Sequence, residues 1–228
     1  MNLDFITPPR TDGAAVAESP MVTVAAARGA ILESRDGWVV PAIFTGDAEQ
    51  RATTETVAFA DVSALCKTEL QGPSRSVLGL VGGLTLGKAT FRSGAWWCPI
   101  TPTRALVIGS APHRADLDGV SSLDVTTQYC GLRIKGPLAR QLTSRFCALD
   151  LRPSVAPPGS ILPGSVARTP GLVIVEGPQR LLLLVGSALA EYVWTVVDDA
   201  ARRLGGRAVG ADVLAGGAIQ SVEVASDA

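Results

Sequence analysis

The sequence predicts an α+β fold in which two related α/β half-units pack about a pseudo-two-fold axis and build mixed or antiparallel sheets. Two observations lead to this fold class: strand and helix patterns alternate with few long crossovers, and one block of sequence occurs twice. Asp-Val-Ser at 61–63 precedes a strand pattern at 66–71 and a Gly-Pro step. Asp-Val-Thr at 124–126 precedes a strand pattern at 130–135 and a second Gly-Pro step. One supersecondary unit used twice predicts a single domain, because two copies are too few for a solenoid.

A second block follows each copy and supports the repeat. Pro-Thr-Arg at 102–104 and Pro-Gln-Arg at 178–180 each open an apolar run that ends in Gly-Ser-Ala. The aliphatic residues at 105–108 and 181–185 predict buried strands. The second copy is longer between its blocks, and the additional residues fall within 152–170, which holds five prolines. We therefore expect a surface loop there.

The organisation along the chain follows from these blocks. The first residues lack apolar periodicity and are rich in proline, alanine and small polar residues, which is typical of a flexible segment. Two strand-like runs within 21–43 flank an Asp-Gly turn at 36–37, and the polar segment 49–56 is compatible with a helical turn. We expect a flexible arm at 1–20, a first half-unit at 21–115, a second half-unit at 116–214 packed with the first as one domain, and a flexible tail at 215–228.

Each Gly-Pro step predicts the end of a strand and the start of a helix, because proline is well tolerated at the first helical position. After the second step, Leu138, Leu142 and Phe146 recur at the spacing of a helix face. Ser187 is expected to cap a final helix that ends before the glycine pair at 205–206. The apolar stripe of that helix comprises Leu189, Tyr192, Val193, Val196, Val197, Ala200, Ala201 and Leu204.

Composition and charge narrow the function. Of 228 residues, 47% are apolar and only 18% are charged, against about 25% charged in an average protein. A surface this poor in charge favours a buried subunit interface. The net charge of −1, without a cluster of lysine or arginine, argues against a nucleic-acid or anionic membrane partner. No targeting segment is visible and the longest aliphatic run is too short to span a bilayer, so we expect a soluble, cytoplasmic protein.

The four cysteines do not follow a metal or disulfide pattern. No Cys-x-x-Cys occurs, and the only histidine, His113, stands in a polar loop. Cys66 and Cys130 occupy equivalent places before the two Gly-Pro steps, and each begins a period-two apolar face. We interpret both as buried, reduced small hydrophobes on the core side of a strand. Their faces are Cys66, Thr68, Leu70 and Cys130, Leu132, Ile134, and the opposite faces carry Lys67, Glu69, Gln71 and Gly131, Arg133, Lys135.

No pattern of catalytic residues is present. The chain has no Gly-x-Ser-x-Gly elbow, no Walker loop and no Gly-x-Gly-x-x-Gly after a strand. The acidic pairs at 198–199 and at Asp116 and Asp118 are interpreted as a solvated helix face and a loop. Asp61 and Asp124 are either polar site elements or local turns, and their repetition favours turns. We therefore predict no catalytic and no metal-binding residue in this chain, and we assign no cofactor-binding residue.

Trp96 and Trp97 form the most distinctive local feature. Adjacent indoles in a strand point to opposite faces, so one can be core and the other exposed. Tryptophan is enriched at interfaces because it buries a large area and still offers an N–H. The alternative to an interface role is ordinary packing of the two indoles, one on each side of the strand. We name both residues as candidate contacts with a partner subunit.

Short motifs in a fixed order resemble a known family. Phe-Ala-Asp-Val-Ser at 59–63 and Lys-Thr-Glu-Leu-Gln-Gly-Pro at 67–73 resemble the folate-binding fold of the glycine-cleavage aminomethyltransferase, the T-protein. Within that superfamily the second half is most similar to the gamma subunit of heterotetrameric sarcosine oxidase. The resemblance covers residues 28–205. In the second half it rests on residues 123–126, 132–137, 148–153, 158–159 and 186–188, and residues 100–108 also resemble that subunit's strand just before the second copy.

The resemblance implies the T-protein fold without its C-terminal barrel, for which the chain has no room. The T-protein has an Asn-Gly stretch followed by paired acidic residues, whose carboxylate serves the folate reaction. The corresponding interval here, 87–102, contains no Asp or Glu. The Lys-Gly-Cys signature of the folate-binding proteins linked to iron–sulfur assembly is absent as well.

By resemblance, the chain is expected to be an accessory gamma-type subunit of a heteromeric, flavin-dependent sarcosine oxidase-like amine oxidase or N-demethylase. Flavin- and folate-binding partner subunits would hold FAD or FMN, NAD and tetrahydrofolate, and this chain alone would bind none of them. It would support assembly and one-carbon transfer to tetrahydrofolate by those partners. The alternatives are a free-standing folate-dependent aminomethyltransferase or demethylase, and a folate-binding module.

Overall fold

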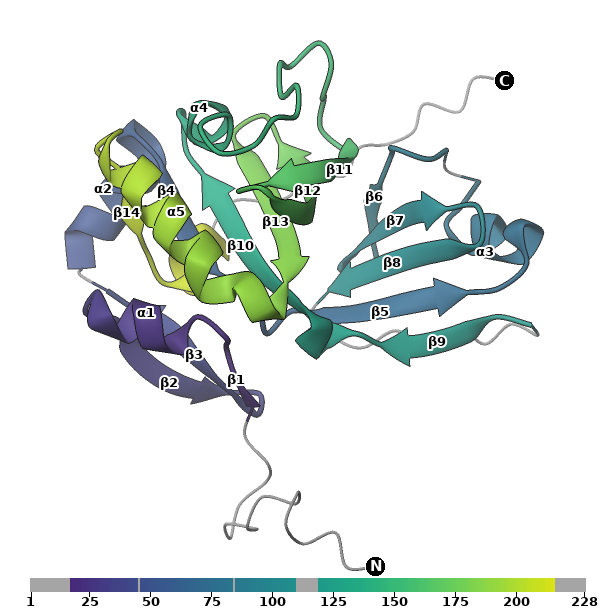
Figure 1. The fold of residues 1–228 in the computed structure, drawn as a ribbon, viewed down its shortest axis with the longest axis horizontal. Helices are drawn as coiled ribbons and strands as arrows, with labels where there is room; N and C mark the ends of the chain where they lie inside the picture. The colour runs from purple at the N-terminus through teal and green to yellow at the C-terminus, as the bar shows by residue number, and fades with distance from the viewer. Residues whose placement is uncertain (1–16, 45, 84, 110–118, 216–228) are drawn as a thin grey trace, which may run out of the picture.

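The structure is a computed structural model that describes residues 17–44, 46–83, 85–109 and 119–215. Its strands form three sheets (Figure 1), which are paired antiparallel except for β1 with β3 and β4 with β14. The predicted α+β class with mixed and antiparallel sheets is thus confirmed. No helix in the described ranges is long and apolar enough to cross a membrane.

The sheets are given by their strand order. The N-terminal sheet is β1 (Ala17–Glu18), β3 (Trp38–Ile43) and β2 (Ile31–Arg35). The six-stranded sheet is β11 (Ile161–Val166), β12 (Thr169–Gly177), β13 (Arg180–Gly186), β10 (Tyr129–Lys135), β4 (Ala58–Asp61) and β14 (Arg207–Ala208). The five-stranded sheet is β6 (Thr90–Arg92), β7 (Ala95–Thr101), β8 (Arg104–Gly109), β5 (Cys66–Gln71) and β9 (Ser121–Asp124).

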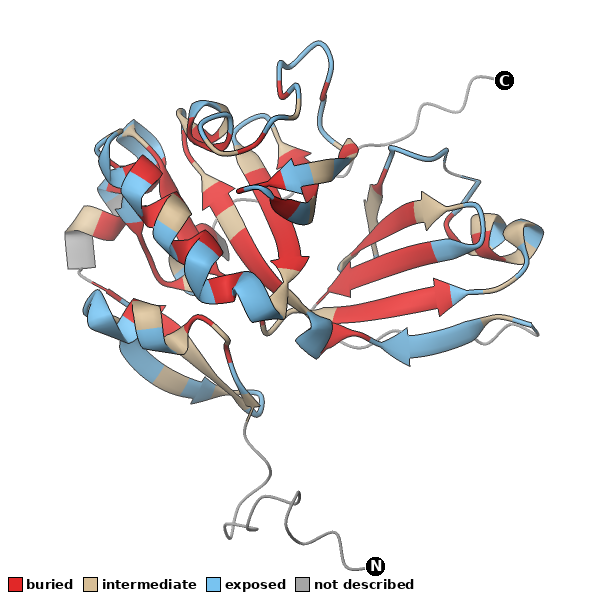
Figure 2. Ribbon diagram, viewed as in Figure 1, coloured by how far each residue is buried: buried red, intermediate tan, exposed pale blue. Residues whose placement is uncertain are grey.

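The helices cover the outer faces of the two larger sheets. The α-helices are α1 (Val22–Ala27), α2 (Gly46–Glu55), α3 (Ser74–Leu80), α4 (Ala139–Thr143), α5 (Ala190–Arg202) and α6 (Ala211–Ala215). Helices α1, α4 and α5 cover one face of the six-stranded sheet, whose other face packs against the five-stranded sheet. Helix α3 covers the far face of the five-stranded sheet. In Figure 2 the central strands of both sheets are therefore buried, whereas β9 at an edge is exposed.

Alternation along the strands follows these layers. On β13, Leu181, Leu183 and Val185 pack toward the helices, while Leu182 and Leu184 pack between the two sheets. The prediction that this strand is buried on both faces is confirmed. The tight turn at Asp36 and Gly37 is also confirmed, with φ of 48° and 79° at its two residues.

The N-terminal region differs from the strand-only interpretation of 21–43. Val22–Ala27 forms α1, in which three successive alanines favour a helix. Ala25 is fully buried in the core beneath the helical layer, so tertiary packing reinforces this propensity. Within the expected arm, Ala17–Glu18 pairs in parallel with β3, and residues 1–16 lie outside the described residues.

The proline-rich stretch 152–170 is not a loop throughout. Its second part contains β11, which pairs antiparallel with β12 from Val166 opposite Thr169. Pro163 lies within β11 without loss of a ladder hydrogen bond, because β11 is an edge strand. The surface loop is therefore confined to the residues before Ile161.

Helix ends also differ from the sequence prediction. Helix α4 ends at Thr143, so Phe146 lies in the segment that follows the helix. A 3₁₀ turn, Ser187–Leu189, precedes α5, and no side chain hydrogen-bonds to its first backbone N–H groups. The prediction of a Ser187 cap is therefore wrong. The apolar stripe of α5 is split as well, because Leu189 and Tyr192 remain exposed.

Candidate functional site

The two Asp-x-Ser/Thr segments lie where the chain crosses between the two larger sheets. Strand β4 belongs to the six-stranded sheet and leads into β5 of the five-stranded sheet, whereas β9 and β10 make the reverse crossing. The Ser63 N–H donates to Asp61 Oδ1 at 2.8 Å, and the Thr126 N–H donates to Asp124 Oδ1 at 2.9 Å. The interpretation of both segments as local turns is therefore confirmed.

The hydroxyl groups of Ser63 and Thr126 each accept a hydrogen bond from the backbone of the other crossing. The Lys67 N–H donates to Thr126 Oγ1 at 3.0 Å, and the Gly131 N–H donates to Ser63 Oγ at 3.1 Å. Backbone bonds match in the same way, from Val62 N to the Gly131 carbonyl at 2.9 Å and from Val125 N to the Lys67 carbonyl at 2.8 Å. The two crossings are thus tied together by reciprocal hydrogen bonds.

The two crossings differ at Lys67, whose side chain has no counterpart in the other crossing. Its Nζ donates to the carbonyl oxygens of Ser63 at 2.8 Å, Leu65 at 2.9 Å and Thr126 at 3.4 Å. The side chain is fully buried, and burial lowers the pKa of its ammonium to about 8. The equivalent position in the other crossing is Gly131, which has no side chain. Sequence periodicity placed Lys67 and Glu69 on an outer face of β5, and this is wrong because the six-stranded sheet covers that face.

Asp61 is the second buried titratable group of the junction. Its carboxylate accepts hydrogen bonds from the Ser63 N–H and from Ser19 Oγ, which follows β1. Burial raises the pKa of Asp61, and these hydrogen bonds oppose that effect. Lys67 Nζ is enclosed by carbonyl groups and Asp61 is 4% exposed, so both groups are engaged within the chain. The junction holds the two sheets together.

A second buried polar cluster lies between the sheets around Glu176. Arg133 donates to its carboxylate at 2.7 and 2.8 Å, Arg180 at 2.9 Å and Trp96 Nε1 at 3.0 Å. Burial would raise the pKa of Glu176, but the two guanidinium groups more than offset it and the pKa is lowered. A carboxylate that accepts four hydrogen bonds stays ionised and is a structural link between the sheets, not a base.

The two candidate interface residues lie on opposite faces of β7, as predicted. Trp96 packs between the sheets, 5.3 Å from the ring of Phe91, whereas Trp97 packs on the α3 side beneath the Arg92 guanidinium at 4.1 Å. They are 3% and 7% exposed, so residues of the same chain cover both indoles. A contact of either residue with a partner subunit stays a prediction.

The remaining predicted residues are placed as follows. Cys130 is fully buried on the helix side of the sheet, but Cys66 at the start of β5 is only partly buried. Asp198 is 4% exposed and pairs with Arg28 at 2.9 Å, so its interpretation as solvated is wrong. Across the described ranges no group of His, Cys, Asp and Glu is arranged to hold a metal ion. His113, Asp116 and Asp118 lie outside the described residues.

The space between the two larger sheets contains a small cavity. Its volume is about 230 Å³, and it is lined mainly by apolar side chains, with Tyr129 and the Glu69–Arg104 ion pair as its polar groups. Drug-sized ligands occupy cavities of about 300–1,000 Å³. The cavity therefore lies below the usual volume range for drug-sized ligands.

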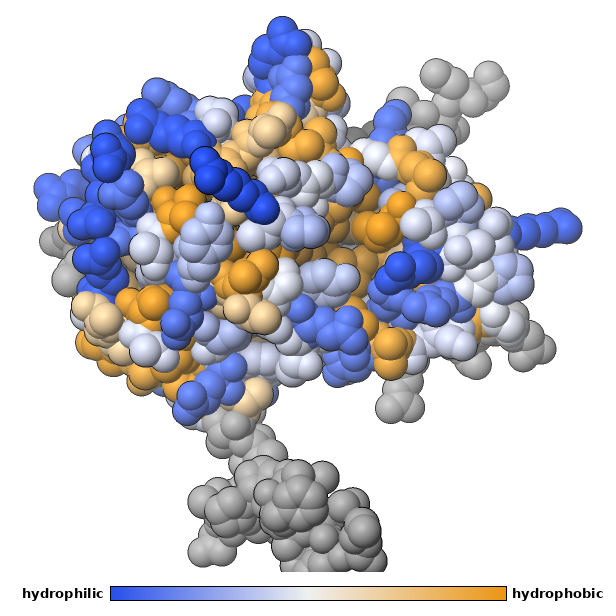
Figure 3. All heavy atoms as spheres, viewed as in Figure 1, coloured by the Kyte–Doolittle hydropathy of each residue, from blue (hydrophilic) through white to orange (hydrophobic). Residues whose placement is uncertain are grey.

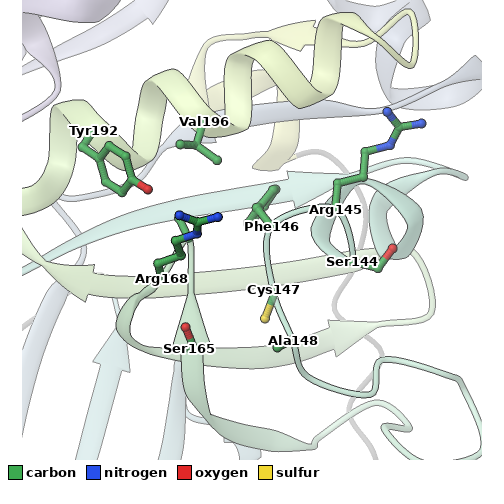
Figure 4. A pocket seen from close by; sticks show the side chains of 10 residues that line it. Ser144, Arg145, Phe146, Cys147, Ala148, Ser165, Arg168, Tyr192 and Val196 are labelled. Atoms are coloured by element: carbon green, nitrogen blue, oxygen red, sulfur yellow. The ribbon is translucent and has the colours of Figure 1, made fainter.

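A wider groove lies on the surface beside α5. Two adjoining hollows of about 440 and 570 Å³ share Arg145, Phe146, Tyr192 and Val196. In Figure 4, Val196 extends from α5 toward Phe146, the hydroxyl end of Tyr192 points toward Arg168, and Phe146 lies between Arg168 and Arg145. Arg168 comes from the β11–β12 turn and Arg145 from the segment that follows α4. No sequence pattern indicated this groove, because its walls come from three separate elements.

The comparisons with known proteins establish the fold. No family model and no curated protein matches the sequence. The fold is similar to a chain of the heterotetrameric sarcosine oxidase from Corynebacterium sp. U-96 in complex with pyrrole 2-carboxylate, with a TM-score of 0.62 and 19% identity over 84% of this chain and 98% of that chain. It is also similar to the glycine cleavage system aminomethyltransferase T from Bartonella henselae, with a TM-score of 0.65 and 13% identity over 86% of this chain and 60% of that chain. The resemblance predicted from sequence is confirmed at the level of the fold.

Proposed function

We propose that this chain is an accessory gamma-type subunit of a heteromeric, flavin-dependent amine oxidase or N-demethylase of the sarcosine oxidase type. The observation that carries the proposal is the extent of the structural match. It spans 98% of one chain of a heterotetrameric sarcosine oxidase but only 60% of the aminomethyltransferase. The fold described here thus corresponds to a whole subunit of the first protein and to a part of the second.

The interior of the chain supports an assembly role. Lys67 and Glu176 are buried charged groups, and each makes three or more hydrogen bonds within the chain. The cavity between the sheets is about 230 Å³, and residues 87–102 offer no carboxylate for folate chemistry. Partner subunits would therefore hold the flavin, NAD and tetrahydrofolate, oxidise the amine and transfer the one-carbon unit.

We further infer that the half-units 21–115 and 116–214 are related by a pseudo-two-fold axis and form one domain. Support comes from the reciprocal hydrogen bonds at the junction and from the strand registers. Gln71 pairs with Arg104 in one sheet, and Lys135 pairs with Arg180 in the other, each beside its Gly-Pro step.

The test is purification of the chain alone and together with the flavin-binding subunits of the proposed complex. Alone, it is expected to show no flavin absorbance and no oxidation of sarcosine. Expressed together, the subunits are expected to elute as one stoichiometric complex. Flavin retained by the chain alone in stoichiometric amount, or sarcosine turnover by it, would contradict the accessory role.

The likeness to the aminomethyltransferase supports a second candidate function, either a folate-dependent transferase or a folate-binding module. Titration of the isolated chain with tetrahydrofolate, followed by the fluorescence of its four tryptophans, separates the two proposals. The accessory role predicts no saturable change. Stoichiometric, saturable binding would favour the alternative.

A further inference from the structure

A second apolar stripe runs along α5 and the turn before it, and its own chain leaves this stripe only partly covered. The buried stripe packs on the six-stranded sheet through Val193 and Val197. The second stripe comprises Leu189 in the turn before α5, Tyr192 and the partly buried Val196, which follow the same helical spacing on another side. Leu189 is 40% exposed and Tyr192 is 46% exposed. In Figure 3, hydrophobic side chains reach this face of the molecule among strongly hydrophilic ones, a mixture typical of protein interaction surfaces.

The groove beside this stripe has an excess of positive charge. Arg203 is balanced by Asp199 at 3.0 Å on the same helix. Arg145 and Arg168 have no ion-pair partner within the described residues, and they lie on either side of Phe146 (Figure 4). Two uncompensated guanidinium groups beside an exposed tyrosine favour a ligand that brings a carboxylate and an apolar group together.

Arg168 has a left-handed backbone conformation that is unfavourable for a residue with a Cβ. Val166 pairs with Thr169, so Ala167 and Arg168 are the central residues of a two-residue turn, with φ of 48° and 64°. Within the described residues, two other two-residue hairpin turns have positive φ at both central residues, and these have Gly37 and Gly94 at the second position. A side chain with a Cβ is unfavourable there, so packing and turn geometry alone would favour glycine in place of Arg168.

We infer that this groove docks an acidic segment of the partner subunit, with carboxylates that pair with Arg145 and Arg168 on either side of Phe146 and an apolar side chain against Tyr192 and Val196. The inference rests on the proposed function, because the partner is the flavin-dependent assembly. A second copy of this chain fits poorly, since a two-fold contact would bring the same arginines toward one another.

Arg168→Gly is a sharp test, because glycine relieves the turn while removing the charge. The variant should fold with unchanged or higher thermal stability but bind the co-expressed flavin subunits about ten-fold more weakly or worse. Arg145→Glu combined with Arg168→Glu should abolish assembly. The control is Arg75→Glu, which reverses one charge at an exposed position of α3, beyond the opposite sheet, and should bind like the parent chain. Added salt should weaken the parent complex more than the Arg168→Gly complex.

The outcomes separate this inference from the proposed function. If the parent chain assembles and both groove variants assemble equally well, the groove is not the docking surface and the accessory role stands. If the parent chain does not associate with the flavin subunits at all, the accessory role fails and the docking inference fails with it. Loss of assembly in Arg75→Glu to the same degree would show a general charge effect and would also overturn the docking inference.

Discussion

The enclosed ammonium of Lys67 predicts a specific dependence of stability on pH. Its pKa falls from an ordinary 10.5 to about 8 in the folded chain because burial disfavours the charged form. Between these values the unfolded chain binds more protons than the folded chain, so the free energy of unfolding rises with pH. At about 1.4 kcal/mol per pH unit, the gain between pH 8 and 10.5 is on the order of 3 kcal/mol. It is absent below pH 8, where both states are protonated.

Denaturant unfolding of the parent chain and Lys67→Met, at half-unit steps from pH 7 to 10.5, isolates this contribution. Other groups titrate in the same range, but they are shared by both chains and cancel in the difference. The stability of the parent relative to Lys67→Met should therefore increase by about 3 kcal/mol over this window. Lys88→Met, a change of the same kind at an exposed position, should show no such trend.

The result that refutes the reasoning is a flat difference. It would mean that Lys67 titrates as it does in water and is not enclosed by the three carbonyl groups. A difference that decreases with pH would show that the carbonyl oxygens stabilise the ammonium more strongly than burial penalises it.

Three further predictions concern the core and the repeat. Trp96→Phe removes the N–H donated to Glu176 and should lower the free energy of unfolding by about 1.5–3 kcal/mol in denaturant titrations; if it instead weakens assembly without a loss of stability, Trp96 is an interface residue. Cys130→Ala should lower the free energy of unfolding by about 1–2 kcal/mol. Burial raises the pKa of the Cys130 thiol to about 12, so Cys130 should react with a thiol reagent far more slowly than the partly exposed Cys66. Equal labelling rates would refute this. In an experimentally determined structure the half-units should superpose with Cys66 on Cys130, and different sheet positions for β5 and β10 would end the duplication argument.

The sequence predicted the strands of both repeat copies well, because alternation and punctuation are local signals. It did not predict the burial of Lys67 and Glu69. Period-two alternation identifies two faces of a strand, but it cannot show that a second sheet covers the polar one. The same limit applies to Asp198 on α5. It is buried beside α1, which is distant in sequence, and pairs with Arg28 at the C-cap of that helix.

The functional features were less accessible to sequence reasoning than the fold. Trp96 and Trp97 were assigned to opposite faces correctly, yet the network around Glu176 was missed because its members come from four strands. The groove beside α5 was missed for a related reason. Arg168 was hidden in a stretch interpreted as a loop, and only the pairing of Val166 with Thr169 places it at a turn where glycine is usual.

The exchange of strands at the junction makes each half-unit depend on the other for folding. A chain cut between 115 and 116 would leave β4 in one fragment without β10, and β9 in the other without β5. Each fragment would then expose unpaired strand edges and aggregate readily. Because β4 and β9 each pair across the boundary between the half-units, native structure requires contacts distant in sequence, which favours slow, concerted folding. Separately expressed halves should consequently gain structure only when mixed.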